Sequence, residues 1–443
     1  MGSPVYGVDA RATLLVLAGT LLTFTAPLHR ADLLAYGLAA MFGGLIWRPR
    51  IGPALVGVVL PVFFFSRALV GPLSFSPHGL LLALAWLAVL ARRVPLRWPR
   101  TGYEAPLALL LAAAIVSLLV SEYLVLSVRE LRADLLEPVL FLALLAALGP
   151  RGAAPSALAG FLVAACATAL AAIVQVAFGL GGTEAEGVRR AQAWYPSPNH
   201  LALMLGRALP FVVAGALAGD SPLRVPRSAW WLACGVISVG LLLTFSTGGW
   251  LGGAVAAVVV VAALGRRWLA WQVGGALALV LVVAFVLAAA GLLPERLNPL
   301  RQTGGFRLDL WLSSLEMVRD HPLLGIGPDN FAYLYQQIYL REGAAAEPNL
   351  SHPHNWLLHV WLELGLAGLT AFVWLLMQAA RAARRALREP DRRWLAAGAL
   401  GSLADLLVHG SIDNSYFLVD LAFVFWITLA AVAEDGRTTR RPS

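Results

Sequence analysis

Two histidines and an asparagine directly precede a long apolar segment of this 443-residue chain. The stretch reads His352-Pro353-His354-Asn355 and closes a polar interval at residues 294–353. Pro353 fixes its own φ and suits the start of a helix, so we expect His354 and Asn355 to occupy the first turn of the helix that follows. An imidazole, with an ordinary pKa of about 6.5, can take a proton from a hydroxyl at neutral pH. The alternative is that these residues only cap and anchor the helix.

Metal binding is the other chemistry that paired histidines suggest. His352 and His354 are separated by one residue, and His359 and Glu363 are one helical turn apart. The sequence contains neither an HExxH pattern nor a third ligand at a recognisable spacing, so we expect no metal and no other cofactor. His359 and Glu363 share one face of a helix, which favours a polar pair inside the protein.

A second cluster of polar and aromatic residues covers residues 188–200 and leads into another apolar segment. It contains Arg189, Arg190 and Asn199, with Trp194 and Tyr195 between them. Guanidinium groups bind phosphate oxygens through two parallel hydrogen bonds, so the cluster suits an anionic ligand that carries a ring, such as a sugar phosphate. The alternative is an aromatic belt with basic flanks at a membrane interface.

A third cluster lies inside the polar interval. Residues 307–318 have helical periodicity, with one apolar stripe made of Leu308, Trp311, Leu312 and Leu315. This pattern predicts a helix that lies on a membrane surface and presents Arg307. The Gly-Ile-Gly-Pro sequence at residues 325–328 has no Walker lysine and does not follow a strand as GxGxxG, so it predicts a tight turn and not a nucleotide loop.

The composition places all three clusters in a membrane protein. Hydrophobic residues make up 59% of the chain and charged residues only 13%, with a mean hydropathy of +0.75. Apolar runs such as residues 270–293 and 356–380 are long enough to cross a hydrocarbon core of ~30 Å at ~1.5 Å per residue. They must be helical, because lipid satisfies no backbone polar group. We therefore expect an all-α polytopic membrane protein with about 12–14 transmembrane helices.

The net charge of +8 comes entirely from arginines in short loops, which indicates membrane topology and not nucleic-acid binding. The positive-inside rule assigns the basic clusters to the cytoplasm: residues 48–50, 92–100, 266–267, 381–393 and 437–441. It assigns the polar interval to the outer side, together with the loops at residues 181–198, 246–249 and 410–415.

The predicted organisation has four parts. These are an N-terminal transmembrane bundle (1–293), one large extracytoplasmic loop (294–353), C-terminal transmembrane helices (354–434) and a cytoplasmic basic tail (435–443).

Charged residues inside the apolar segments are costly unless they meet a partner or water. The positions concerned are Glu137, Arg207, Glu363, Asp405 and Asp420. They either line a polar cavity or pair between helices, and the sequence is compatible with both.

These clusters, in this order, resemble the O-antigen ligase and polysaccharide polymerase superfamily, the Wzy_C group that includes WaaL ligases, Wzy polymerases and protein O-oligosaccharyltransferases. The residues that carry the resemblance are Arg190 with Pro198-Asn199, the helix break at 246–249, Arg307 with Trp311, the segment 321–328, His354-Asn355, and the segments 363–368 and 408–414. They cover roughly residues 185–430. Thr247 stands where many relatives have an arginine.

The resemblance implies a GT-C-like fold and a metal-independent inverting glycosyltransferase in the cytoplasmic (inner) membrane, with its active site facing the periplasm. Its donor would be a glycan on undecaprenyl diphosphate, and its acceptor hydroxyl would belong to a glycan, a lipid or a protein. His354 would match the general base, and Arg190 and Arg307 would hold the diphosphate. Arg189, Asn199, His352 and Asn355 would support them.

One histidine and two arginines fit the pattern of an O-antigen ligase, which transfers to the lipid A-core. The alternatives are a Wzy-type polymerase and a protein O-oligosaccharyltransferase. A transporter or flippase for the same lipid-linked glycan is the alternative from a different class, because intramembrane charges and a polar cavity would serve it as well.

Overall fold

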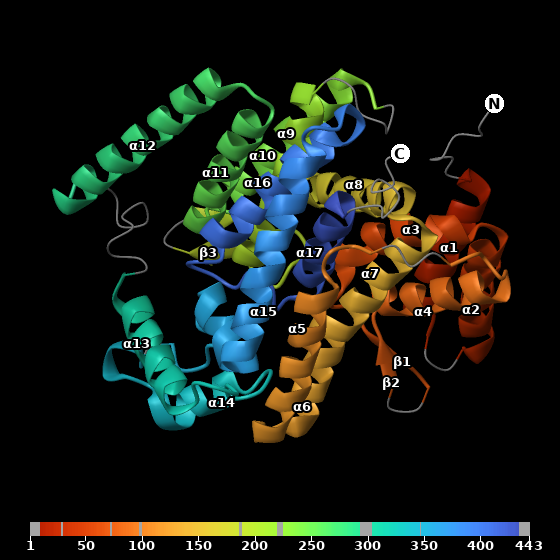
Figure 1. Cartoon of the computed structure of the whole chain (residues 1–443), viewed down its shortest axis with the longest axis horizontal. Coiled ribbons are helices and arrows are strands. Elements are labelled where there is room, and N and C mark those ends of the chain that lie inside the picture. Colours follow the sequence, from red (N-terminus) through yellow and green to blue (C-terminus); the bar gives the residue numbers. More distant parts are fainter. Residues whose placement is uncertain are drawn as a thin grey trace, which may run out of the picture.

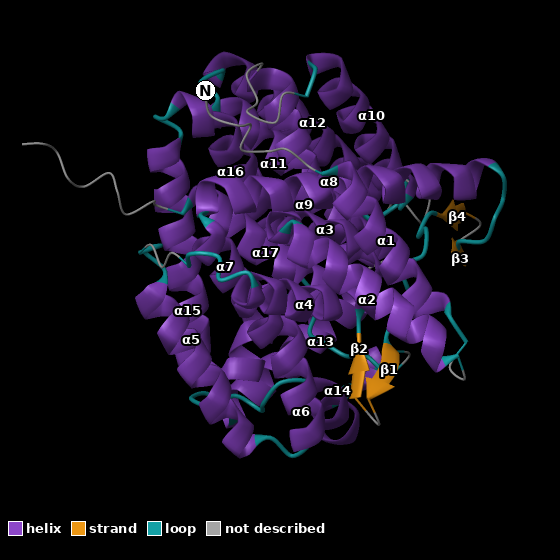
Figure 2. Cartoon of the chain, turned by 90° about the vertical axis from the view of Figure 1, so that its right-hand side faces the viewer, coloured by secondary structure: helices purple, strands orange, loops and turns teal. Residues whose placement is uncertain are grey.

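The computed structural model describes residues 9–27, 30–70, 73–96, 100–185, 188–218, 225–292, 304–345 and 347–433. Nearly all regular structure in these residues is helical, and only two short hairpins contain strands (Figures 1 and 2). The fold is therefore all-α, as the sequence predicts. The predicted basic tail (435–443), the start of the polar interval (294–303) and part of the basic cluster at 92–100 lie outside the described residues.

The first half of the chain contains eight α-helices and one hairpin within the described residues. The helices are α1 (Ala10–Thr25), α2 (Ala31–Trp47), α3 (Gly52–Val59), α4 (Pro77–Ala91), α5 (Glu104–Ser117), α6 (Leu124–Glu130), α7 (Glu137–Leu148) and α8 (Pro150–Ala177). The strands β1 (Arg67–Val70) and β2 (Leu73–Phe75) pair antiparallel.

The second half begins with the hairpin β3 (Thr183–Ala185) and β4 (Val188–Arg190). Its helices are α9 (Pro198–Ala218), α10 (Arg227–Leu243), α11 (Thr247–Ala263), α12 (Arg267–Ala289), α13 (Gly304–Asp320), α14 (Phe331–Leu334), α15 (Trp356–Ala386), α16 (Arg393–His409) and α17 (Val419–Val432). Short 3-10 turns occur at Pro49–Ile51, Leu60–Val62, Leu118–Val120, Glu342–Ala344 and Pro390–Arg392, and π-helical turns at Leu131–Leu136 and Tyr335–Tyr339.

Several of these helices are suited to a membrane. Among the described residues, α8, α9 and α15 are long and apolar enough to span it alone, and α2 with the helix at Pro49–Val62 forms a fourth candidate bent by 105°. Shorter apolar helices accompany them, namely α1, α4, α5, α10, α11, α12 and α17. The class of polytopic membrane protein is thus supported, and the count of 12–14 spans stays a prediction.

Helix α9 lies at the centre of one helix group and packs against α8, α10, α11 and α16 (Figure 1). Every residue from Leu201 to Val212 is buried. Two glycines let α16 approach, because a Cβ at Gly206 or Gly252 would collide with the carboxylate of Asp405. This close packing fixes where the His409 end of α16 lies.

The five charged residues in apolar segments all have polar partners in the fold. The pairs are Arg207 with Asp405 at 3.8 Å, Glu137 with Arg132 at 3.3 Å, Asp420 with the Tyr195 hydroxyl at 2.8 Å and Glu363 with His359 at 2.8 Å. Arg207 also donates to the carbonyl oxygens of Ser402 and Ser415. The Arg207–Asp405 and Tyr195–Asp420 contacts join different elements. Arg132 and Glu137 lie on consecutive turns of the chain, and the predicted His359–Glu363 pair is confirmed within α15.

Helix α15 runs from α13 and α14 at one end of the molecule to the opposite end (Figure 1). The sequence predicts one unbroken helix here, but the backbone breaks at Gly365, where φ is 67° and ψ is −173°. The turn after α13 packs into this break: Ile326 N donates to Leu362 O at 2.6 Å, and Leu366 N donates to Leu323 O at 3.1 Å. A side chain at Gly365 would collide with Leu323 O, which explains the glycine.

Candidate functional site

His354 lies just before helix α15 and not in its first turn, so that expectation is wrong. The Asn355 side chain accepts from Leu357 N and Leu358 N, at 3.0 and 3.2 Å, and is the N-cap. Helix geometry therefore begins at Trp356. His354 itself has a φ of 50°. A left-handed backbone costs a non-glycine residue about 1–3 kcal/mol, and such strain is typical of functional positions.

Two hydrogen bonds join the start of α15 to the segment between α16 and α17. Trp356 N donates to Gly410 O at 2.7 Å, and Asn355 Nδ2 donates to Ser411 O at 3.2 Å. They bring Asp413 beside His354, although the two residues are far apart in the sequence.

Asp413 and His354 form a close polar contact at the centre of the site. His354 Nδ1 lies 2.9 Å from Asp413 Oδ1, and the two side chains are 16% and 6% exposed. Burial alone would raise the pKa of Asp413, but the imidazoles of His352 and His354 lower it, to well below its usual value. An ionised carboxylate can only accept, so Nδ1 carries the proton and donates. In the neutral form of the imidazole, this leaves Nε2 of His354 as the nitrogen that can accept a proton.

His352 completes a cluster of three groups. Its Nε2 lies 3.8 Å from the same Asp413 oxygen, and its ring centroid is 4.3 Å from that of His354. Burial lowers the pKa of His352 to about 3, so this imidazole is neutral near pH 7. The ligand atoms of His352, His354 and Asp413 all lie within 4.8 Å of one another, so the group could hold a divalent cation.

Asp413 is the site residue that sequence reasoning missed. It belongs to the segment 408–414, which contributes to the family resemblance, but no spacing rule connects it to His354. The available signal was the polar run Asp413-Asn414-Ser415 between two apolar helices.

Arg307 lies on α13, and the presence of this helix confirms the helix predicted around Arg307. Trp311 Nε1 donates to Pro353 O at 3.1 Å and so ties α13 to the loop that carries His354. Arg307 is half-buried and lies within electrostatic range of Asp413. Burial lowers the pKa of Arg307 and Asp413 opposes that shift, so the guanidinium remains charged.

Arg190 is connected to the cluster through the start of α9. It lies on β4, where Nη2 donates to Asn199 Oδ1 at 2.8 Å and Nε donates to Thr244 O at 2.9 Å. The next residue of α9, His200, is within electrostatic range of both His354 and Asp413. Arg190 and Asn199 are thus held beside the cluster by the start of α9.

Arg189 is not brought into this arrangement. Its Nη2 lies 3.0 Å from Glu184 on the paired strand, and both side chains are exposed. The hairpin itself was not predicted, because residues 183–190 contain no alternating apolar pattern.

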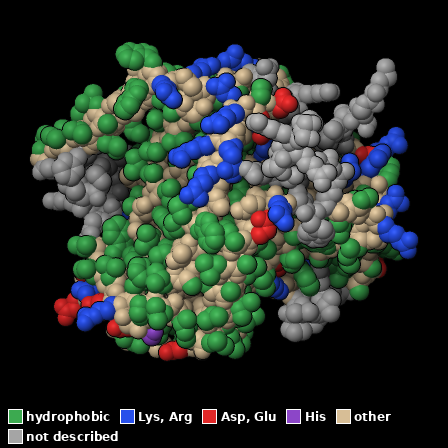
Figure 3. Space-filling view, in the orientation of Figure 1, with side chains coloured by type: hydrophobic (Ala, Val, Ile, Leu, Met, Phe, Trp, Pro, Cys, Tyr) green, Lys and Arg blue, Asp and Glu red, His purple; other side chains and the backbone are tan. Residues whose placement is uncertain are grey.

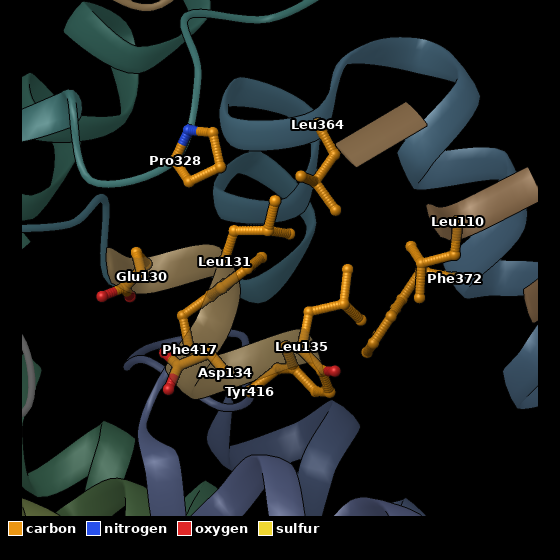
Figure 4. Close-up of a pocket in the computed structure, with 10 residues that line it drawn as sticks. All are labelled: Leu110, Glu130, Leu131, Asp134, Leu135, Pro328, Leu364, Phe372, Tyr416 and Phe417. Carbon is orange, nitrogen blue, oxygen red and sulfur yellow. The ribbon is translucent and has the colours of Figure 1, made fainter. Parts of the chain in front are cut away.

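A separate small pocket lies beside the break in α15 (Figure 4). Glu130 and Asp134 lie toward one side of it, with Leu110 and Phe372 toward the other. Glu363, next to the lining residue Leu364, lies within electrostatic range of both acids. The pocket is thus mainly apolar, with acidic groups along one wall.

The outer surface divides into apolar and basic regions. Figure 3 shows arginines over the upper part of this face, along the end of α15, and many hydrophobic side chains over the middle. The arginines of this end are Arg381, Arg384, Arg385 and Arg388. Basic residues at one end of a membrane helix fit the predicted cytoplasmic side.

Fold and site together define a polytopic membrane protein with a histidine–carboxylate pair, an arginine of α13 within electrostatic range of it, and a second arginine held at the start of α9. Residues 232–373 match the family model Wzy_C, described as O-Antigen ligase. This match supports membership of the O-antigen ligase superfamily, whose members act in glycan transfer at membranes. The matched region contains Arg307 and His354, and neither Arg190 nor Asp413. A search of curated proteins found no match.

Proposed function

We propose that this protein is a metal-independent inverting glycosyltransferase that transfers a glycan from undecaprenyl diphosphate to an acceptor hydroxyl. The family match supports glycan transfer in general. The observation that carries the finer proposal is the contact of 2.9 Å between His354 and Asp413, with Arg307 within electrostatic range of the same carboxylate. This arrangement puts a proton acceptor and a fixed cation close together.

In the proposed step, the acceptor oxygen attacks the anomeric carbon from the side opposite the diphosphate. The new carbon–oxygen bond forms as the bond to the diphosphate oxygen breaks, so the configuration inverts. The hydroxyl proton goes to His354 Nε2, and Asp413 stabilises the resulting imidazolium through Nδ1. The departing diphosphate keeps the bonding electron pair.

Arg307 and Arg190 would bind that diphosphate. Guanidinium groups bind phosphate oxygens with two hydrogen bonds and stay charged, so they can stabilise the leaving anion without a metal. Asn199 holds Arg190 in place, and Trp311 anchors the helix that carries Arg307. The contact of Arg189 with Glu184 argues for a role in the hairpin and not at the diphosphate.

The cluster of His352, His354 and Asp413 makes metal dependence testable. A cation bound there would occupy the nitrogen and carboxylate atoms that the proposal assigns to proton transfer. Addition of a chelator is therefore expected to leave the transfer rate unchanged. Loss of activity that zinc or another divalent cation restores would replace the general-base proposal with a metal-assisted one.

The proposed location is the cytoplasmic (inner) membrane, with the site on its outer side. The arginines at the far end of α15 support this orientation through the positive-inside rule. We favour an O-antigen ligase with a lipid A-core acceptor. A Wzy-type polymerase and a protein O-oligosaccharyltransferase use the same donor chemistry and differ in the acceptor molecule that carries the hydroxyl.

The test of catalysis is replacement of His354 by alanine in purified, reconstituted protein. We expect glycan transfer to be abolished while the lipid-linked donor still binds. His321→Ala is the matched control, because His321 is an exposed histidine of the same interval outside the cluster. Transfer that survives in His354→Ala would rule out the general-base role.

Mass analysis of the product identifies the acceptor. A defined donor is offered with a core oligosaccharide lipid, a second lipid-linked repeat or a protein. The mass of the new species distinguishes ligase, polymerase and protein transferase.

A transporter for lipid-linked glycans is the second candidate, and the acidic groups Glu130, Asp134 and Glu363, which lie within electrostatic range of one another, favour it. Ionisable groups inside membrane proteins are typical of transport pathways. A transporter would move labelled lipid-linked glycan across liposomes without forming a new glycosidic bond. Observation of that bond in the same vesicles would decide for the transferase.

A further inference from the structure

The cluster of His352, His354 and Asp413 has distances that suit a metal ion as well as a catalytic pair. Measured from Asp413 Oδ1, His354 Nδ1 is 2.9 Å away and His352 Nε2 is 3.8 Å away. A tetrahedral Zn²⁺ ion with bonds of about 2.0–2.1 Å separates its ligand atoms by about 3.3 Å. The two distances lie on either side of this value, so small side-chain adjustments would bring all three groups into coordination.

His352 is the member of the cluster that has no step in the proposed reaction. Its Nδ1 lies 2.8 Å from the Ser351 hydroxyl, whereas its Nε2 is buried and has no hydrogen-bond partner among the described residues. The distance of 3.8 Å to Asp413 is too long for a hydrogen bond. With its proton on Nδ1, His352 offers the lone pair of Nε2 beside the carboxylate.

The contact with Ser351 is of the kind that supports a metal ligand. A histidine that binds a metal through one ring nitrogen typically donates its other N–H to a neighbouring polar group, which fixes the ring and its tautomer. Ser351 lies in the right place for this on the Nδ1 side of His352. The arrangement therefore prepares Nε2 to bind an ion, and it has no other evident purpose in the cluster.

The ligand atoms also determine which kind of ion fits. Two imidazole nitrogens and one carboxylate oxygen suit Zn²⁺ and related transition-metal ions, whereas Mg²⁺ and Ca²⁺ prefer oxygen ligands. The side chains of His352 and His354 are 14% and 16% exposed, so an ion can reach them from solvent. The cluster is therefore an accessible site for zinc and a poor one for magnesium.

We propose that Zn²⁺ binds to His352, His354 and Asp413 and thereby inhibits glycan transfer. The ion is a reversible inhibitor and not a cofactor, so the inference is compatible with metal-independent transfer. Inhibition rests on the proposed function, whereas zinc binding does not.

Zinc removes the proton acceptor by changing the tautomer of His354. In the pair with Asp413, Nδ1 carries the proton and Nε2 accepts. When a Zn–Nδ1 bond forms, the Nδ1–H bond breaks and the neutral ring carries its proton on Nε2, which then only donates. The carboxylate of Asp413 coordinates the same ion and no longer stabilises an imidazolium. One binding event therefore disables both parts of the proposed general base.

Zinc binding is measured first, on detergent-solubilised protein without donor and without a polyhistidine tag. Competition with a chromogenic chelator gives the affinity. The variants are His352→Ala and His354→Ala. His321→Ala is the matched control, because His321 is an exposed histidine outside the cluster. Asp413→Asn, which keeps the size of the side chain, repeats the comparison if an alanine variant fails to fold.

We expect each cluster variant to bind zinc at least ~10-fold more weakly than the wild type, because the loss of a residue that merely supports a ligand already costs about 10- to 100-fold. The control variant is expected to keep the affinity of the wild type, and excess Mg²⁺ is expected not to displace zinc. Equal affinity in the wild type and the cluster variants would overturn the proposal, because the zinc would then be bound elsewhere.

Inhibition is measured on reconstituted protein as the zinc concentration that halves each protein's own zinc-free rate. A metal buffer sets free zinc, since the donor diphosphate also binds it. We expect a chelator to restore the rate and His352→Ala to need at least ~10-fold more zinc than the wild type or His321→Ala. An unchanged value in His352→Ala, or a rate that zinc increases, would overturn the inhibition. A zinc-free wild type that forms no glycosidic bond would contradict the proposed function instead and leave the zinc affinities unaffected.

Discussion

Replacing Asp413 by asparagine removes the charge beside His354 and keeps the size of the side chain. The two groups are 2.9 Å apart, and Asp413 is ionised in the folded protein because its pKa is held well below the usual value. In the proposed transition state the imidazole becomes a cation. Two unit charges about 4 Å apart at an effective dielectric constant of about 20 attract with about 4 kcal/mol. At about 1.4 kcal/mol per tenfold change, kcat is expected to fall by roughly 10³.

The assay follows transfer from a fluorescent lipid-linked glycan across a range of pH. Donor KM is expected to change little, because Asp413 faces the base and not the diphosphate. The acidic limb of the pH–rate profile is expected to move to lower pH, because the imidazolium loses a stabilising charge. Asp391→Asn, at an exposed aspartate between α15 and α16, is the control. A folded Asp413→Asn protein with a rate within a few fold of the wild type would refute the reasoning.

Three further predictions follow from the same geometry. Arg307→Ala and Arg190→Ala are each expected to weaken donor binding or turnover by roughly 10- to 100-fold, which is what the loss of one charged hydrogen bond costs. The lysine variants are expected to recover part of this loss, because lysine keeps the charge and lacks the planar fork. Full activity of the alanine variants in initial-rate titrations would show that these arginines are not part of the site. Because burial lowers the pKa of His352 to about 3, the unfolded chain binds more protons than the folded chain between about pH 6.5 and 3, so stability is lost as pH falls through this window. A His352→Gln protein is expected to show a smaller drop in Tm between pH 7 and 5, and an equal drop would contradict this. Gly365→Ala is expected to lower the free energy of unfolding by at least about 1–3 kcal/mol, because φ at this position is 67° and the alanine Cβ would collide with Leu323 O. An unchanged Tm would show that the break tolerates a side chain.

The class of protein and several local features were predictable from the sequence because they depend on short-range rules. Long apolar runs must form helices in lipid. The periodicity around Arg307 predicted α13, the spacing of His359 and Glu363 predicted their contact, and the glycines at 325 and 327 predicted a tight turn, in which both have positive φ. Each of these needs only residues that are neighbours in the chain.

The features that were missed depend on contacts between distant segments. Asp413 reaches His354 only because Gly410 and Ser411 bond to the start of α15. The break at Gly365 exists because the turn at Leu323 packs against it. The backbone of His354 could not be foreseen either, since the capping side chain of Asn355 decides where the helix begins.

The bond between Trp311 and Pro353 joins two parts of the site that are otherwise built separately. The base and its carboxylate sit beside helix ends that are bonded to each other. Arg307 sits on α13, which is attached to α15 through the Trp311–Pro353 bond and through the turn that follows α13. In the proposed mechanism, recognition of the leaving group and activation of the acceptor are therefore carried by different segments of the chain. Residues 304–345 could diverge to suit a different donor while residues 352–355 and 410–413 keep the same proton chemistry. Such a separation would let one scaffold serve many glycans.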